Sequence, residues 1–370
     1  MVAPCHELSG RNLEGSPKDG DMSSLAEYVQ QLDGSDEAER IYAAEDIGYR
    51  NAPDGVPPLL KRLSQEPSRA VRDAIFQALI RIDADASIEG SIWLLESEDP
   101  QIRNQAVDVL RHKGARSVPF LDRAMRNGDR DVRKFVLDVL SGVQAGGVDE
   151  IYLAALADHD ENVVITAVEN LGRIRATQFR RRIEELLLAG LHPMLVGACL
   201  EALAGIGDES SLAAIRGRFP DLGVVPDFFL VSCVKAFGAL GAAAEFVEMT
   251  GLLAVRGHHL RPAILGALVA IRQRKPTEIH GEQLLPPLQA VVDNGDPPLC
   301  RYQAVRVLGF LACHDEVHSF LVSCLSSPER LVRLGAVESL RESPRPGLQD
   351  ILVACAAKET DEEVLQALGC

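Results

Sequence analysis

Aromatic side chains are scarce in this chain: they make up 5% of its 370 residues, and only one of them is tryptophan. The core must therefore be built from Leu, Val, Ile and Ala, which pack well between closely stacked helices. The sequence also lacks a run of 18 uncharged apolar residues and an N-terminal apolar segment of the secretion-signal type. We therefore expect a cytoplasmic protein that does not enter a membrane.

Cysteine is present but without paired spacing, which argues against a disulfide framework or a zinc knuckle. We interpret most of the thiols as reduced core residues of a cytosolic protein. The eight cysteines are Cys5, Cys199, Cys233, Cys300, Cys313, Cys324, Cys355 and Cys370.

Basic residues are in deficit, with 38 Lys and Arg against 54 Asp and Glu and a formal net charge of -16. The resulting negative field opposes phosphate backbones and anionic lipid heads. We therefore expect neither nucleic acid nor membrane as a partner, and a protein as the partner instead.

Catalytic motifs are also absent. No Gly-rich phosphate loop joins a strand to a helix, and no Gly-x-Ser-x-Gly string occurs. The string from Cys313 to His318 is the only one with metal-ligand character, because His314 and His318 share a helix face beside a thiol. Structural zinc needs four well-spaced ligands, and no second pair is evident. We assign no catalytic, cofactor-binding or metal residue, and an enzymatic function is not favoured.

What the chain does contain is a repeat. One nine-residue string recurs ten times, mostly 30 to 34 residues apart. The string typically begins with an apolar residue, often followed by Arg, has a small apolar residue four positions after its start and ends in Leu. A period of this length is typical of a solenoid. The ten copies are Glu39–Ile47, Val71–Leu79, Ile102–Leu110, Val132–Leu140, Val163–Leu171, Leu195–Leu203, Phe229–Phe237, Leu260–Leu268, Cys300–Leu308 and Val332–Leu340.

Each copy has the periodicity of a helix. Apolar residues recur at offsets 0, 4, 5 and 8 from the start of the motif, which places them on one stripe of a 3.6-residue helix. Second apolar stretches and turn residues separate the copies, so each unit is predicted to be helix, turn, helix. The second stretches are Val56–Leu63, Ile88–Leu95, Val118–Met125, Ile151–Leu156, Ile183–Leu188, Leu284–Val292 and Val317–Leu325.

The motif resembles the HEAT repeat family, and in particular the short bacterial HEAT-like repeats of E/F-type phycobilin lyase subunits. The strings that carry the resemblance are Asp99-Pro-Gln-Ile-Arg-Asn-Gln-Ala-Val-Asp-Val-Leu110 and Asp129-Arg-Asp-Val-Arg133. The resemblance implies an all-α, right-handed solenoid of about ten to eleven repeats over residues 22–370. Residues 1–21, rich in Gly, Pro, Ser and charge, are predicted to be a disordered tail.

The second position of the motif carries Arg in seven repeats but Val164, Val196 and Leu230 in the three middle ones. In HEAT-like arrays such an Arg resembles one that bonds an acidic residue in the preceding turn, forming a ladder, and Asp99 and Asp129 are suitably placed. The three apolar residues have two interpretations: a drier core, or an apolar strip on the wall that binds a partner. The seven arginines are Arg40, Arg72, Arg103, Arg133, Arg261, Arg301 and Arg333.

Two further segments depart from the pattern. A basic run stands out against the acidic background and is predicted either to meet an acidic partner or to be a solvated face; it comprises Arg173, Arg175, Arg180, Arg181 and Arg182. The gap between the eighth and ninth motifs lengthens to 40 residues and holds a polar loop with Pro and Gly at 272–281. We predict a seam there.

A full-length repeat array without catalytic residues indicates a non-enzymatic scaffold or adaptor that binds a partner protein on its curved surface. The resemblance implies one alternative, a phycobilin lyase-like subunit that handles a tetrapyrrole and its acceptor protein, for which Tyr42, Tyr49 and Tyr302 are candidates. The cysteines and the Cys313–His318 string suggest another, a platform for metal or cluster assembly.

Overall fold

The structure is a computed structural model that describes residues 24–190, 192–274, 284–343 and 345–369. The chain divides into two compact units, residues 1–151 and 152–370. Every regular element in the described ranges is a helix, which confirms the predicted all-α solenoid. The predicted tail lies outside these ranges, as does most of the predicted seam; Arg272 to Arg274 form the end of a helix.

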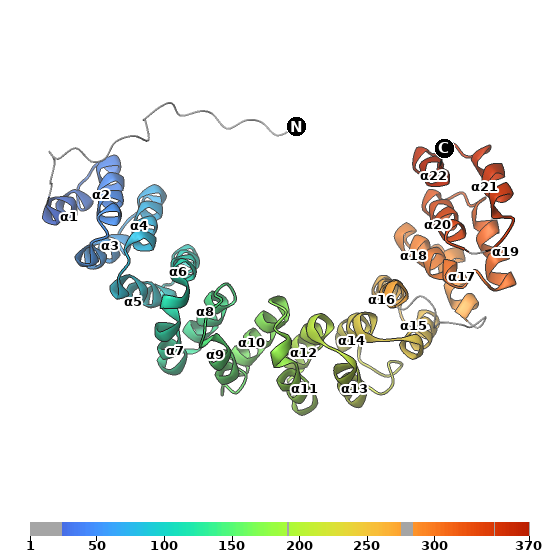
Figure 1. The fold of residues 1–370 in the computed structure, drawn as a ribbon, viewed down its shortest axis with the longest axis horizontal. Coiled ribbons are helices and arrows are strands. Elements are labelled where there is room, and N and C mark those ends of the chain that lie inside the picture. The colour runs from blue at the N-terminus through green and yellow to red at the C-terminus, as the bar shows by residue number, and fades with distance from the viewer. Residues whose placement is uncertain (1–23, 191, 275–283, 344, 370) are drawn as a thin grey trace. The chain divides into compact units, whose positions relative to one another are not determined.

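The first unit is a series of helix pairs (Figure 1). Short 3-10 turns precede α3 and α7 and follow α5. The helices are α1 (Leu25–Leu32), α2 (Glu37–Tyr49), α3 (Val56–Leu63), α4 (Arg69–Arg81), α5 (Asp85–Trp93), α6 (Pro100–Lys113), α7 (Val118–Asn127) and α8 (Arg130–Leu140), and α9 (Val148–Ala155) contains the boundary between the units.

The second unit continues the same alternation. Its helices are α10 (Glu161–Arg173), α11 (Arg180–Ala189), α12 (Pro193–Ile206), α13 (Glu209–Arg218), α14 (Asp227–Leu240), α15 (Ala243–Val255), α16 (Arg261–Arg274), α17 (Leu285–Asp293), α18 (Pro298–Gly309), α19 (Asp315–Cys324), α20 (Arg330–Arg341), α21 (Leu348–Ala356) and α22 (Glu362–Leu368).

The helices form two layers within each unit. Successive even-numbered helices pack side by side, as α2 does with α4 and α12 with α14, and odd-numbered helices pack in the same way, as α11 does with α13 (Figure 1). We call these the even layer and the odd layer. The motif copies lie in the even layer, and the second apolar stretches lie in the odd layer. The sequence analysis did not identify α1, α13, α15, α21 and α22.

The core lies between the two layers, where the motif predicted it. The residue at offset 4 is at most 1% exposed in all ten repeats. A helix that buries one stripe in this way is stabilised mainly by packing, because isolated helices of this length are marginal in water. The ten residues are Ala43, Ile75, Ala106, Val136, Ala167, Cys199, Cys233, Ile264, Ala304 and Ala336.

Neighbouring even-layer helices approach each other closely through small residues. A Cβ added to Gly172 would lie 2.8 Å from Ala202 Cα, and one added to Gly238 would lie 2.7 Å from Ala267 Cβ. Such distances leave no room for a side chain, so glycine is required where the backbones meet.

Polar turn residues precede several of the even-layer helices. The carboxylates of Asp99, Asp129 and Asp160 cap α6, α8 and α10 by accepting hydrogen bonds from backbone N–H groups of the first turn. The next two even helices begin differently: His192 precedes α12 and Pro226 precedes α14, and neither side chain caps its helix.

Candidate partner-binding site

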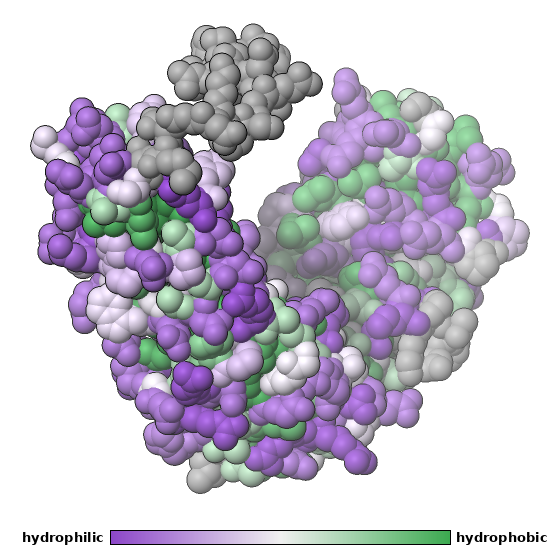
Figure 2. Space-filling view, turned by 60° about the vertical axis from the view of Figure 1, so that its left-hand side comes forward, coloured by the Kyte–Doolittle hydropathy of each residue, from purple (hydrophilic) through white to green (hydrophobic). Residues whose placement is uncertain are grey.

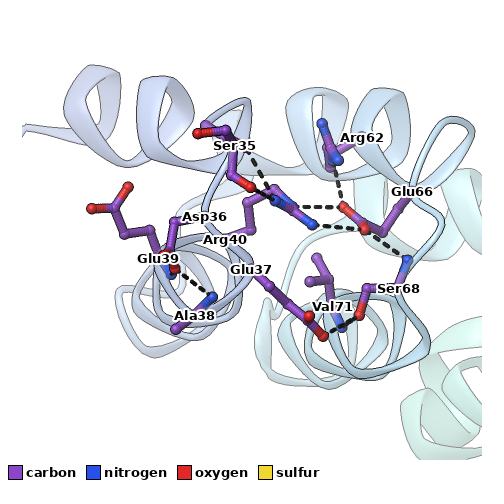
Figure 3. Close-up of polar contacts among 11 residues, drawn as sticks. Ser35, Asp36, Glu37, Ala38, Glu39, Arg40, Arg62, Glu66, Ser68 and Val71 are labelled. Atoms are coloured by element: carbon purple, nitrogen blue, oxygen red, sulfur yellow. Dashed lines mark hydrogen bonds and ion pairs between the residues drawn. The ribbon is translucent and has the colours of Figure 1, made fainter.

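The arginine ladder is clearest in the first repeats. Arg40 is buried, and its guanidinium binds the carboxylate of Glu66, with Nε 2.9 Å from Oε2. On its other side it donates to the carbonyl of Ser35 at 2.9 Å. Arg62 and the backbone N–H of Ser68 also donate to Glu66 (Figure 3). Burial raises the pKa of Glu66, but these donors outweigh it, so the pKa lies below its ordinary value.

Pairs of a motif arginine with a carboxylate recur toward both ends of the array. They correct one detail of the ladder predicted from the sequence: the acidic partner belongs to the turn that follows the motif, not to the turn that precedes it. Arg72 pairs with Asp99 at 3.0 Å, and Arg301 pairs with Glu329 at 3.0 Å. The preceding turn supplies backbone carbonyls instead, as Ser97 does for Arg103. An arginine that makes both contacts, as Arg40 does, ties two successive turns together.

We call each arginine–carboxylate pair of the ladder a rung. The rung nearest the C-terminus shifts the pKa of its carboxylate the most. Arg333 binds Glu359, with Nε 2.8 Å from Oε2, and also donates to the carbonyl of Ser327. The hydrogen bonds from Arg333 hold the pKa of Glu359 at about 2, against an ordinary 4.5. The glutamate is therefore ionised at any physiological pH.

The three middle repeats replace the ladder by apolar packing. Val164, Val196 and Leu230 are 5%, 1% and 0% exposed, which agrees with the drier-core interpretation. Their burial leaves almost no surface for a partner, and the alternative that they bind one stays a prediction. In this region a partly buried ion pair joins two helices of the odd layer: Arg216 on α13 binds Glu245 on α15 at 2.9 Å.

The basic run makes mainly internal contacts. Arg180 pairs with Asp208 at 2.9 Å, and Arg182 pairs with Glu185 at 2.8 Å. Arg173 donates to the side chain of Asn170, and Arg175 donates to the carbonyl of Gly205. Arg181 is exposed. Binding of an acidic partner by this run stays a prediction.

The surface of the even layer that faces away from the odd layer includes two rows of residues that the sequence analysis did not consider. The first row holds the residue immediately before each motif, and the second holds the residue at offset 2. In α4 to α16 the residues of both rows are exposed or half-buried, because they lie on the side of the helix opposite the buried stripe.

From α10 to α16 the second row loses its polar residues, and the first row becomes apolar in α12 and α14, whereas Asn162 and His259 keep it polar in α10 and α16. Met194 and Phe228 occupy the first row and are 53% and 61% exposed, and Val231 in the second row is 45% exposed. The helices that carry them are neighbours, since α10 packs on α12, α12 on α14 and α14 on α16. Equivalent positions of adjacent helices therefore form one continuous patch. We call it the apolar face; its residues are Ile165, Met194, Gly197, Phe228, Val231 and Pro262.

In the first unit both rows are polar in α6 and α8, and in α4 the second row is polar while Ala70 occupies the first. The first row carries Gln101 and Asp131, and the second carries Asp73, Asn104 and Lys134. Figure 2, in which the left-hand side of Figure 1 comes forward, shows mostly hydrophilic side chains on the side of the N-terminal helices that faces the viewer, with smaller hydrophobic patches between them. The apolar face is thus a local property and not a general feature of the repeat.

The charges around the apolar face differ between its edges. Lys235 pairs with Glu201, and Asp227 pairs with Arg256, so these charges are neutralised within the chain. On α10, Glu161 and Glu169 are exposed, and no ion pair involves either of them among the described residues. The edge formed by α10 therefore carries uncompensated negative charge.

The other candidate residues do not converge on one site. Among the described residues, no group of three or more His, Cys, Asp and Glu side chains is placed to hold a metal ion. Tyr42 and Tyr49 are exposed, whereas Tyr302 donates to Glu338 and burial raises its pKa to about 12. Burial also raises the pKa of Cys199 to about 12, as expected for an inert core thiol.

No helix in the described ranges combines the length and the apolar character needed to cross a lipid bilayer.

Comparison with known proteins supports the repeat assignment. The family model of HEAT repeats matches residues 25–90 and 285–369, so the predicted HEAT repeats are confirmed in these two segments. No curated protein sequence matches the chain significantly.

The chain is similar to two solved structures. The crystal structure of a Kap121p mutant has a TM-score of 0.51 and 13% sequence identity over 93% of this chain and 44% of that one. This chain therefore spans less than half the length of Kap121p. A crystal structure of an engineered protein has a TM-score of 0.42 and 18% identity over 93% of this chain and 97% of that one.

Proposed function

We propose that this protein is a non-enzymatic scaffold or adaptor that binds another protein on the apolar face of its even layer. One observation carries the proposal: two surface rows that are polar in α6 and α8 are apolar in the neighbouring helices α12 and α14, and the second row stays apolar in α10 and α16. Exposed apolar patches of this kind cost solubility and mark interaction sites in soluble proteins. Phe228 is the best candidate anchor, because buried aromatic side chains dominate interface energies.

The proposal requires no movement of the helices. The residues of the apolar face lie on helices whose opposite stripe is fully buried, so the surface is held in place by the core. A preformed surface loses little conformational entropy when a partner binds. The phycobilin lyase-like function and the metal or cluster platform stay predictions from the sequence.

The test compares proteins captured from a native extract by the wild-type chain and by two variants. Met194→Asp with Phe228→Asp places charge in the first row of the apolar face, and Gln101→Asp with Asp131→Asn alters the same row in the first unit. We expect the first variant to lose a partner that the second retains. Equal capture by all three chains would contradict the proposal, provided that circular dichroism shows unchanged helicity.

A further inference from the structure

We infer that the partner segment on the apolar face is an amphipathic α-helix that crosses α12, α14 and α16 and carries basic residues where it reaches α10. This inference rests on the proposed function and adds the chemistry of the partner. It follows from the backbone available on the apolar face, the spacing of its helices and the charges at its edge.

The apolar face favours a helix over an extended peptide. Peptides that bind as strands need an unpaired sheet edge, and the described residues of this chain contain helices only. Polyproline segments need a groove lined by several aromatic rings, whereas Phe228 is the one aromatic residue of the apolar face. An amphipathic helix needs only an apolar surface with room for close approach.

Glycine provides that room. A Cβ added to Gly197 or to Gly266, which lies one turn beyond Pro262 on α16, would meet nothing within 4 Å. Both glycines lie inside helices, where glycine costs roughly 0.5–1 kcal/mol relative to alanine and no close backbone neighbour requires it. This contrasts with Gly172 and Gly238, which are in tight contact with the next helix. Gly197 therefore lowers the surface of α12 next to Met194, and Gly266 lowers the surface of α16 next to Pro262.

The spacing of the helices sets the spacing of the partner's apolar residues. Packed helices lie about 8–10 Å apart. A helix rises about 1.5 Å per residue, so a helix that crosses them advances from one to the next in about five to seven residues. Of these spacings, about seven residues also keeps the apolar residues on one face of the partner helix. A partner that contacts α12, α14 and α16 therefore needs apolar residues near i, i+7 and i+14, and about 15 to 20 residues in all.

The charges on α10 determine which side chains the partner must carry at the end that lies over this helix. Glu161 and Glu169 are exposed there, and neither takes part in an ion pair among the described residues. On the other three helices, Glu201 is paired with Lys235, and Asp227 is paired with Arg256. Lys or Arg in the last two turns of the partner would neutralise the two glutamates, whereas acidic residues would be repelled.

The inference is tested by selection from a displayed library of random 20-residue peptides on the full-length chain, followed by affinity measurement with the selected peptides made synthetically. We expect peptides with apolar residues about seven apart and a cluster of Lys or Arg at one end. Phe228→Asp should weaken their binding at least tenfold. Glu161→Gln with Glu169→Gln should weaken it about three- to tenfold, with most of that difference lost at high salt.

The outcomes separate the inference from the proposed function. Selected peptides that depend on Phe228 but lack the seven-residue spacing or the basic end would overturn the inference and leave the apolar face as a binding site. Selected peptides that bind the Phe228→Asp variant as tightly as the wild type would overturn both. Gln101→Asp, at the equivalent position of α6, serves as the control and should leave every affinity unchanged.

Discussion

Two stretches of the even layer, α4 to α8 and α12 to α16, share a buried stripe and differ on the surface. The offset-4 residue is fully buried in both, as Ala106 and Cys233 illustrate. The surface rows, however, carry Gln101 and Asp131 in one stretch and Met194 and Phe228 in the other. The buried positions of a repeat report how it stacks on its neighbours, and the exposed positions report what it binds.

The arginine ladder also differs between the ends and the middle of the array. Its arginines lie toward the two ends of the array, and the middle repeats have Val164, Val196 and Leu230 in their place. The HEAT family model also matches two segments toward the ends, residues 25–90 and 285–369. The middle repeats thus lose the ladder and part of the polar surface, while they keep the stacked core.

Breaking the ladder at its most buried rung should have the largest effect. Arg40→Met leaves the carboxylate of Glu66 buried with Arg62 as its one remaining cationic partner, and we expect the first unit to lose about 3 kcal/mol of unfolding free energy. The double variant Arg40→Met with Glu66→Leu imitates the apolar packing of the middle repeats and should recover most of the lost unfolding free energy. Hydrogen exchange of α2 and α4 measures both variants. A double variant as unstable as the single one would show that apolar packing cannot replace a rung.

Filling a close helix contact in the middle repeats should cost somewhat less. Gly238→Ala places a methyl group 2.7 Å from the Cβ of Ala267, so α14 and α16 must move apart. We expect a loss of about 2 kcal/mol, as is typical of an overpacked core. Denaturant unfolding followed by circular dichroism provides the measurement. Unchanged stability would mean that the middle helices are packed less tightly than described.

Acid should weaken the last rung. The pKa of Glu359 is about 2 in the folded chain, below its ordinary 4.5, so its ionised form stabilises the fold above pH 4.5 and that contribution is lost as the pH falls toward 2. Hydrogen exchange of α20 and α22, corrected for intrinsic rates, should show reduced protection at pH 2.5 compared with pH 5. Arg333→Gln should lower protection at pH 5 and reduce the pH dependence. An equal pH dependence in both chains would assign the effect to other carboxylates.

The smallest expected effect is a gain. Gly197→Ala adds a methyl group in open space inside α12 and removes the conformational freedom of glycine, so the unfolding free energy should rise by roughly 0.5–1 kcal/mol. It is the matched control for Gly238→Ala, because the same substitution is made in the neighbouring even helix. A loss of stability at position 197 would show that the apolar face is covered by part of this chain.

Much of the fold could be predicted from the sequence, because the buried stripe repeats regularly. The motif copies identified the even layer, and Val56–Leu63 coincides with α3. The helices α13 and α15 were missed for different reasons: α13 buries two residues, Ser211 and Ile215, and α15 is apolar on most of its circumference, so neither shows a clear stripe.

The candidate site was harder to predict, because the residues that define the motif are those that pack in the core. Val164, Val196 and Leu230 drew notice as departures from the pattern, but an apolar residue on the buried side of a helix is satisfied by its neighbours. The apolar face lies at positions where the motif tolerates any residue. Comparison of the first and second rows across repeats, which needs only the sequence and the period, would have shown Met194, Phe228 and Val231 opposite polar residues of earlier repeats.

The central claim is that partners contact α12 to α16 and not the equivalent surface of the first unit. Photo-crosslinking in the native cell tests it most directly, with p-benzoylphenylalanine in place of Phe228 in one chain and of Gln101 in another. Both residues occupy the first row, so only the location differs. The account predicts a discrete crosslinked protein from position 228 and none from position 101. Crosslinks from position 101 alone, or the same ones from both positions, would contradict it.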